Sequence, residues 1–322
     1  MAPGRGPIEL ADLVEQARQG QPRALGRLIS LVEDESPALA ELAGRLAPLA
    51  GHAQVVGITG PPGVGKSTTT SALIAALRAT GRRVGVLAVD PSSPFSGGAL
   101  LGDRIRMTEH ATDSGVFIRS MATRGQLGGL AAAAPQALRV LDVAGFDVVL
   151  LETVGVGQSE IDVVRLADTT LVLLAPGMGD GIQAVKAGIL EIADVFVVNK
   201  ADRDDAGTVS RNLRHLQAMA GADGASGGGW TVPILRTVAT RSEGIDELVR
   251  AIERHRSWLA GSGELDRRRQ ARARAEIEAI AIEQLRRRFR DGADGPTLDE
   301  LAGRVLDGSL DPYRAVEQLL GD

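Results

Sequence analysis

The chain has 322 residues, more than one hydrophobic core usually holds, so one α/β domain with helical additions is expected. Hydrophobic residues make up 44% of it but aromatic residues only 2%, so the core must be aliphatic. Because there is no cysteine, disulfides, thiolate zinc sites and cysteine nucleophiles are excluded. The net charge of −5 argues against a general nucleic-acid-binding protein.

Targeting and membrane signals are missing from the sequence. The N-terminus has no basic segment followed by an apolar stretch, so no signal peptide is expected. No run of about 18 apolar residues occurs, so no membrane span or membrane partner is expected. The cytoplasm is therefore the expected location.

Residues 1–50 alternate aliphatic and charged side chains at helical spacing, which predicts three short amphipathic helices. Pro22 and Pro37 each fall near a helix start, where proline is tolerated. We expect these residues to form an N-terminal helical segment.

Residues 51–261 repeat a pattern of strand, loop and helix. Several of the strands are nearly continuous apolar runs, which is typical of strands covered on both faces. This alternation predicts an α/β domain with a doubly wound, mainly parallel sheet. The predicted strands are 55–59, 83–90, 115–121, 147–153, 169–175, 195–199 and 232–238.

The first predicted strand breaks into residues 60–67, which fit G-x-x-x-x-G-K-[ST] and precede a predicted helix over 67–80. Glycines let successive N–H groups point inward, and the helix N-terminus adds partial positive charge. Lys66 can then reach the β- and γ-phosphates, and the Ser67 hydroxyl can ligate Mg²⁺. The segment predicts a site for a nucleoside triphosphate.

Two later strands end in acidic residues, Asp90 and Glu152. Mg²⁺ usually takes one or two carboxylates besides water and phosphate, so both are candidates for the metal site; the alternative is a capping role in the next loop. The N–H of Gly155, just after Glu152, is well placed to bond the γ-phosphate. Loops after these strands, and after the fifth, indicate a conformational switch rather than simply long connections.

The sixth strand ends in Asn199, Lys200, Ala201 and Asp202, the pattern N-K-x-D. Ligands bind at this edge of an α/β sheet. The Asp202 carboxylate can accept hydrogen bonds from guanine N1–H and the exocyclic amine, a pair of donors that adenine lacks. The pattern therefore favours GTP over ATP, whereas a plain turn is the alternative reading.

Residues 262–322 differ in composition, with an arginine-rich helix predicted over 264–290 and shorter helices near 297–306 and 312–320. The arginine runs at 267–269 and 286–288 could contact RNA or form a solvated helix that packs on a partner subunit. The acidic total favours the second reading, so we expect a homodimer and no nucleic-acid partner.

Taken together, these motifs resemble the MeaB/ArgK group (MMAA-like) of P-loop GTPases, the methylmalonyl-CoA mutase-associated GTPases. The resemblance covers nearly the whole chain, and the segments at 89–107 and 175–194 are particular to the group. The matching segments are GPPGVGKST at 60–68, VDPSSPFSGGALLGDRIRM at 89–107, ETVGVGQSE at 152–160, APGMGDGIQAVKAGILEIAD at 175–194 and NKAD at 199–202.

The resemblance implies a P-loop NTPase fold of the SIMIBI type with a C-terminal helical dimerisation arm. It implies a Mg²⁺ set of Ser67, Asp90, Asp103 and Glu152 and a guanine reader of Asn199, Lys200 and Asp202. The implied phosphate cradle is Gly60, Pro61, Pro62, Gly63, Val64, Gly65, Lys66, Ser67 and Thr68. The implied backbone contacts to the base come from Val238, Ala239 and Thr240, where relatives carry Ser-Ala-x and this chain has valine first.

The resemblance also implies a role: a GTP-hydrolysing chaperone that gates cobalamin delivery to, and protects or reactivates, an adenosylcobalamin-dependent acyl-CoA mutase, methylmalonyl-CoA mutase by default. An extra switch that communicates with the mutase would include Asp180, Gln183 and Lys186, with Arg106 as a further candidate. No general base can be named, although Gln158 is a candidate, so slow intrinsic hydrolysis is expected.

Three other functions compete with this one. A nickel metallochaperone GTPase would carry Cys or His clusters, but this chain has no cysteine and its histidines are scattered at 52, 110, 215 and 255. A transport-system kinase would need a motif that positions a phosphate acceptor, and none is seen. A non-enzymatic binding module is disfavoured by the intact Lys66, Ser67 and acidic residues.

Overall fold

The computed structural model describes residues 9–34, 36–90, 107–122, 129–153, 165–177, 192–221, 229–291 and 297–320. The chain divides into two compact units, Met1–Arg272 and Ala273–Asp322, and each is described by itself below.

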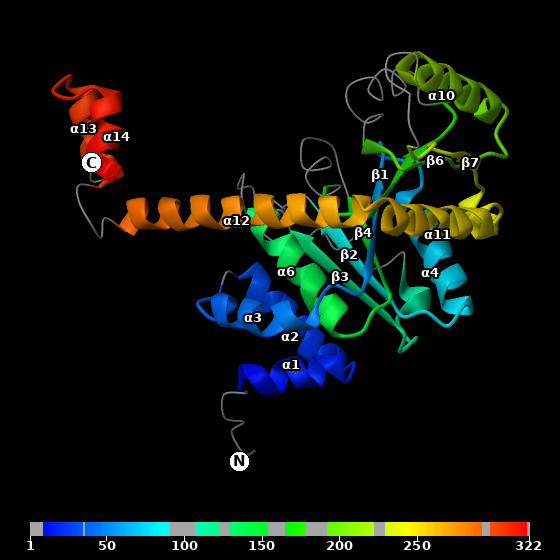
Figure 1. Cartoon of the computed structure of the whole chain (residues 1–322), viewed down its shortest axis with the longest axis horizontal. Coiled ribbons are helices and arrows are strands. Elements are labelled where there is room, and N and C mark those ends of the chain that lie inside the picture. The colour runs from blue at the N-terminus through cyan, green and yellow to red at the C-terminus, as the bar shows by residue number, and fades with distance from the viewer. Residues whose placement is uncertain are drawn as a thin grey trace. The chain divides into compact units, whose positions relative to one another are not determined.

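The first unit is built on a seven-stranded sheet in which every neighbouring pair of strands is parallel (Figure 1). The order across the sheet is β3-β2-β4-β1-β5-β6-β7. The predicted doubly wound parallel sheet is confirmed, and each of the seven predicted strands forms. The strands are β1 (Gln54–Thr59), β2 (Val84–Asp90), β3 (Val116–Ala122), β4 (Val148–Thr153), β5 (Thr169–Leu174), β6 (Val195–Val198) and β7 (Ile234–Arg236).

Helices cover both faces of this sheet, which is why its strands read as apolar runs. Alternate residues of one strand enter different cores: in β4, Leu150 packs with α4 and α11, whereas Leu151 packs with α6 and the N-terminal helices. The far end of the sheet has a third core, where Phe196 packs against α10. The helices of this unit are α1 (Leu10–Arg18), α2 (Pro22–Glu33), α3 (Leu39–Leu46), α4 (Lys66–Ala79), α6 (Gly129–Val143), α10 (Ala206–Gly221) and α11 (Ile245–Ser262), with short 3₁₀ turns η1 (Ala47–Leu49), η2 (Thr108–His110) and η4 (Ala239–Arg241).

The three helices predicted for residues 1–50 form and belong to the same core as the sheet. Pro22 is the first residue of α2, where a missing N–H breaks no helical hydrogen bond. Leu28, Ile29 and Val32 of α2 are fully buried against this core. The N-terminal segment therefore stabilises the sheet unit.

The position of β1 marks the site. β4 lies on one side of β1 and β5 on the other, so the chain changes direction across the sheet at this strand. In doubly wound sheets, ligands bind outside the carboxyl ends of the strands at such a switch point. The loop between β1 and α4 lies at that place.

The second unit contains the later part of α12 (Glu264–Asp291), followed by α13 (Leu298–Leu306) and α14 (Pro312–Leu320). A capping box begins α13: Thr297 Oγ1 accepts from Glu300 N, and Glu300 Oε2 accepts from Thr297 N at 2.9 Å. Several of its large apolar side chains are exposed, among them Ile277, Leu306 and Tyr313. Across the described part of the chain, no helix is long and apolar enough to cross a membrane.

Candidate functional site

The loop of residues 60–65 joins β1 to α4 and is shaped by two glycines that no other residue could replace without strain. Gly60 has φ +139°, and a Cβ on it would collide with the backbone oxygen of Leu173 in β5. Gly65 has φ +97° at the N-cap of α4, and a Cβ on it would collide with the side-chain nitrogen of Asn199. These glycines let the loop pack closely against β5 and the tip of β6.

Lys66, the first residue of α4, is buried and turns its ammonium into the loop. Its Nζ donates to the backbone oxygen of Gly60 at 2.6 Å and lies 3.3 Å from that of Pro61. The charge is thus held at the helix N-terminus, where backbone N–H groups also add positive potential. This is the arrangement in which a phosphate chain can replace the carbonyl contacts.

Ser67 and Glu152, which the sequence predicts to share a metal site, are brought together. Ser67 Oγ donates to Glu152 Oε1 at 2.7 Å. Glu152 lies on β4, opposite Ile58 of β1, and is fully buried. The second oxygen of its carboxylate, Oε2, is 2.9 Å from Thr70 Oγ1. A hydroxyl and a carboxylate therefore face each other directly below the loop.

Asp90 is the last residue of β2, two strands from β1, and its side chain lies outside the described part of the chain. The other predicted phosphate-sensing, metal and switch residues lie outside the described part of the chain. They are Asp103, Arg106, Gly155, Gln158, Asp180, Gln183 and Lys186. Their roles stay predictions.

Asn199, at the tip of β6, connects the loop of residues 60–65 to the segment predicted to contact the base. Its Nδ2 donates to Val64 O at 2.9 Å, and its Oδ1 accepts from Ala239 N at 3.1 Å. Thr237 Oγ1 also donates to Oδ1, at 3.2 Å. One buried amide thus fixes the distance between the two predicted ends of the site.

Lys200 and Asp202, which follow Asn199, lie at the end of the site predicted to bind the base. Lys200, with φ +56°, donates from Nζ to Gly63 O at 2.7 Å. Asp202 is 42% exposed and lies 3.7 Å from a guanidinium nitrogen of Arg241. Val238 and Ala239 are buried, whereas Thr240 is exposed. The carboxylate of Asp202 is therefore open to solvent beside the segment that would contact a base.

Three residues of this site were not named by sequence reasoning: Thr70, Thr237 and Arg241. Each contacts a predicted site residue that is distant in the sequence or lies in another loop. A local sequence motif therefore does not indicate it. For Thr70 the only hint is its position one helical turn after Lys66, on the same face of α4.

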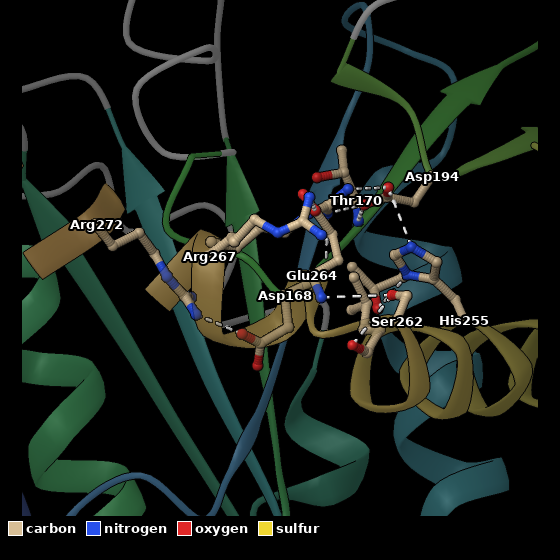
Figure 2. A network of polar contacts seen from close by, with 11 residues as sticks. Asp168, Thr170, Asp194, His255, Ser262, Glu264, Arg267 and Arg272 are labelled. Atoms are coloured by element: carbon tan, nitrogen blue, oxygen red, sulfur yellow. Dashed lines mark hydrogen bonds and ion pairs between the residues drawn. The ribbon is translucent and has the colours of Figure 1, made fainter. Parts of the chain in front are cut away.

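A second polar cluster lies at the opposite end of the strands from the phosphate loop, at the amino ends of β5 and β6 (Figure 2). Asp194 Oδ2 accepts from Thr170 N at 2.8 Å, and both of its oxygens accept from Arg268 of α12 at 2.9 Å. Asp168 accepts from Val55 N at 2.9 Å and pairs with Arg272. We call this set the arm-root cluster: Asp168, Thr169, Thr170, Asp194, His255, Arg268 and Arg272.

The charge of Asp194 is stabilised by its partners in the arm-root cluster. Burial raises the pKa of its carboxyl, but the interactions with His255 and Arg268 outweigh burial, so the pKa lies below its usual value. His255 is fully buried, with Nε2 3.2 Å from Asp194 Oδ1 and Nδ1 2.9 Å from Thr169 Oγ1. The arginine run at 267–269, expected to be solvated, instead places Arg268 half-buried against the sheet.

Comparison with known proteins agrees with the motifs and the fold. Residues 25–294 match the family described as "Methylmalonyl Co-A mutase-associated GTPase MeaB". A putative GTPase of Pyrococcus abyssi is 47% identical over 309 residues, which are 96% of this chain and 95% of that protein. The mouse mitochondrial methylmalonic aciduria type A homolog is 36% identical over 82% of this chain and 64% of its own length.

A solved structure described as a LAO/AO transport system kinase has 30% sequence identity and a TM-score of 0.71. It covers 98% of this chain and 99% of its own. Family, identity and fold agree over nearly the whole length, so the chain belongs to the MeaB family of methylmalonyl-CoA mutase-associated GTPases and is a P-loop GTPase that binds guanine nucleotide.

Proposed function

We propose that this chain is a GTP-hydrolysing chaperone of an adenosylcobalamin-dependent acyl-CoA mutase. It gates the delivery of cobalamin to the mutase and protects or reactivates it. Methylmalonyl-CoA mutase is the first candidate for this partner. The link to the mutase is supported by the family description and by the methylmalonic aciduria homolog. The proposal that the ligand is a guanine nucleotide rests on one observation. Asn199 links Val64, in the loop of residues 60–65, to Ala239, one of the residues predicted to contact the base. This contact suits a ligand that has both phosphates and a base.

In the proposed complex, the backbone of residues 60–68 cradles the phosphates of GTP. Lys66 exchanges its contacts to the loop carbonyls for the β- and γ-phosphate oxygens, where charge develops during hydrolysis. Asp202 accepts hydrogen bonds from the guanine edge, while Asn199 and Lys200 hold the loop in place. The backbone of Val238, Ala239 and Thr240 contacts the base.

The residues present fit Mg²⁺, which is proposed to be held by Ser67, Asp90, Asp103 and Glu152. Ser67 and Glu152 offer a hydroxyl and a carboxylate 2.7 Å apart, the oxygen ligands that this ion prefers. Among the described residues, no three His, Asp or Glu side chains form a metal-binding group. Bound Mg²⁺ usually also takes waters and phosphate oxygens of the substrate, which would complete the site. When bound, the ion would neutralise charge on the β,γ-bridge and γ-oxygens.

The switch is proposed to include Gly155 at the γ-phosphate and Asp180, Gln183 and Lys186, with Arg106, toward the mutase. The general base is left unassigned, with Gln158 as the candidate, and turnover by the isolated chain is proposed to be slow. A slow switch can be timed by its partner, which suits a chaperone. The second unit is proposed to form a homodimer through its exposed apolar side chains, such as Ile277 at 69% exposure.

The test is phosphate release from GTP by the purified full-length chain, alone and with methylmalonyl-CoA mutase from the same organism. We expect slow phosphate release from the chain alone and clearly faster release when the mutase is added. A Lys66→Ala variant, shown to be folded by circular dichroism, should release no phosphate. Fast release without any partner would contradict the chaperone role. A labelled phosphoprotein in place of free phosphate would favour a transport-system kinase, the description carried by the solved relative.

A further inference from the structure

Thr70 lies in the same helix as Lys66 and Ser67, and its side chain is fully buried. Its hydroxyl oxygen is 2.9 Å from Glu152 Oε2 and 3.0 Å from the backbone oxygen of Lys66. The other carboxylate oxygen, Glu152 Oε1, accepts from Ser67 Oγ at 2.7 Å. Each oxygen of the buried carboxylate therefore meets one hydroxyl of α4.

This two-point attachment fixes the orientation of the carboxylate plane. The terminal torsion of a glutamate side chain is broad, so a second hydrogen bond from the same helix restricts it further. Hydrogen bonds to a charged group are among the stronger ones, so the loss of one donor to a buried carboxylate is costly. Thr70 thus adds a hydrogen bond to one carboxylate oxygen, while Ser67 holds the other.

The contact to the Lys66 carbonyl gives Thr70 a second acceptor. A threonine hydroxyl has one hydrogen, so it can donate fully to only one of the two acceptors at a time. Back-bonding to the carbonyl four residues earlier is common for threonine in a helix and has no functional meaning by itself. The contact to Glu152 is the feature that a purely helical role does not explain.

We propose that Thr70 is a positioning residue for Glu152 in the Mg²⁺-dependent binding of guanine nucleotide, an inference that rests on the proposed function. Thr70 holds Oε2 so that Oε1 stays directed at Ser67, the residue that shares the metal site. It touches neither nucleotide nor metal. Partners that orient a metal-linked carboxylate typically contribute 10–100-fold in metal affinity or activity.

The neighbouring residue provides a matched control. Thr69 is also fully buried in α4, and its hydroxyl has no hydrogen-bond partner among the residues that the structure describes. Thr70→Val and Thr69→Val make the same isosteric change, one position apart, in the same helix. Only the first removes a donor from Glu152.

The experiment is calorimetric titration of GDP into the full-length chain, once with Mg²⁺ and once with EDTA. For wild type we expect tighter binding with Mg²⁺. Thr70→Val should reduce the ratio of the two affinities about tenfold, while Thr69→Val and the conservative Thr70→Ser keep the wild-type ratio. Circular dichroism checks the fold, and Thr70→Ala serves as the second variant if Thr70→Val does not fold.

Failure of this inference and failure of the proposed function give different results. If wild type shows the Mg²⁺ effect and the variants of Thr70 that lack the hydroxyl keep the same ratio as Thr69→Val, the positioning role is wrong while the proposed function stands. If Thr70→Val weakens binding equally in Mg²⁺ and EDTA, the role is structural and the inference is also overturned. If wild type binds no GDP in either condition, the proposed function fails and the inference fails with it.

Discussion

Asp202 is the residue on which nucleotide choice would depend. Its neighbour Asn199 is buried and has its amide hydrogen-bonded within the protein, whereas the Asp202 carboxylate is 42% exposed at the tip of the same loop. An exposed carboxylate in a loop fixed by a buried amide is available to a ligand and is held at a defined place.

Replacing Asp202 with asparagine should change the preferred base. Guanine presents two donors to this carboxylate, and hydrogen bonds to a charged group contribute about 1.5–3 kcal/mol each, so affinity for GDP should fall about 100-fold or more. Xanthine presents an acceptor in place of the amine and should bind the Asp202→Asn variant better than guanine does. Competition binding with GDP and XDP measures both changes.

Asp204→Asn is the control for this change, because Asp204 is exposed in the same loop and the substitution removes the same charge. It should leave the preference for GDP as in wild type. Unaltered selectivity in the Asp202→Asn variant would refute the assignment of this residue as the guanine reader.

At the scale of elements, the root of α12 is tied to the amino ends of two central strands. Arg268 binds both oxygens of Asp194, which is only 5% exposed and precedes β6. Removing the guanidinium by Arg268→Ala would leave a buried carboxylate with fewer partners, which should lower the free energy of unfolding by about 3 kcal/mol. Arg267→Ala is the control: Arg267 is 73% exposed and pairs with Glu264, so its loss should cost less than about 0.5 kcal/mol.

This contribution should depend on pH in a defined direction. The pKa of Asp194 is lowered in the folded protein, so its stabilisation is present above the unfolded value of about 3.9 and is lost as pH falls through the folded pKa. Urea unfolding at a series of pH values from about 7 to 3 tests this. The difference between wild type and Arg268→Ala should be full at neutral pH and shrink below about pH 4. A difference that is constant with pH would contradict a charge-dependent role for the pair.

The sequence predicted the elements well because each depends on local pattern. Seven apolar runs predicted the seven strands, and the glycine-rich loop named Lys66 and Ser67 without any knowledge of the fold. The contacts of Thr70 with Glu152 and of Arg268 with Asp194 could not be predicted, because they join residues 82 and 74 positions apart. The strand order places β4 beside β1 and so brings Glu152 to α4, and the packing of α12 on the sheet brings Arg268 to Asp194.

At the scale of the whole molecule, composition predicts a segment boundary near residue 262, and that boundary stays a prediction. The first compact unit extends to Arg272. The reason is the arm-root cluster: Arg268 and Arg272 attach the first turns of α12 to the sheet. The arginine-rich composition by itself does not distinguish such anchoring residues from solvated ones.

The proposed homodimer gives a prediction for the second unit. Ile277, Ile280 and Leu285 of α12 are 69%, 37% and 43% exposed, and burying one such side chain is worth about 1.5–3 kcal/mol. Ile277→Glu should therefore weaken dimerisation at least about tenfold. Light scattering coupled to size-exclusion chromatography measures the mass over a range of concentrations.

Met219→Glu is the control for this change, since Met219 is a 59% exposed apolar residue on α10 of the first unit. It should leave the mass unchanged. A wild-type chain that runs as a monomer at every concentration would remove the basis for the proposed dimer.

Both tryptophans of the chain lie beside the arm-root cluster. The rings of Trp230 and Trp258 pack on that of His255, at centroid distances of 4.7 and 5.7 Å, and on each other, at 5.8 Å. Trp230 also donates from Nε1 to the backbone oxygen of Asp194 at 2.8 Å. Indole fluorescence of this protein therefore arises wholly at the sheet edge opposite the phosphate loop. A change in tryptophan fluorescence on nucleotide binding would therefore report a structural change transmitted along the strands. The two native tryptophans serve as a probe of communication between the two ends of the sheet.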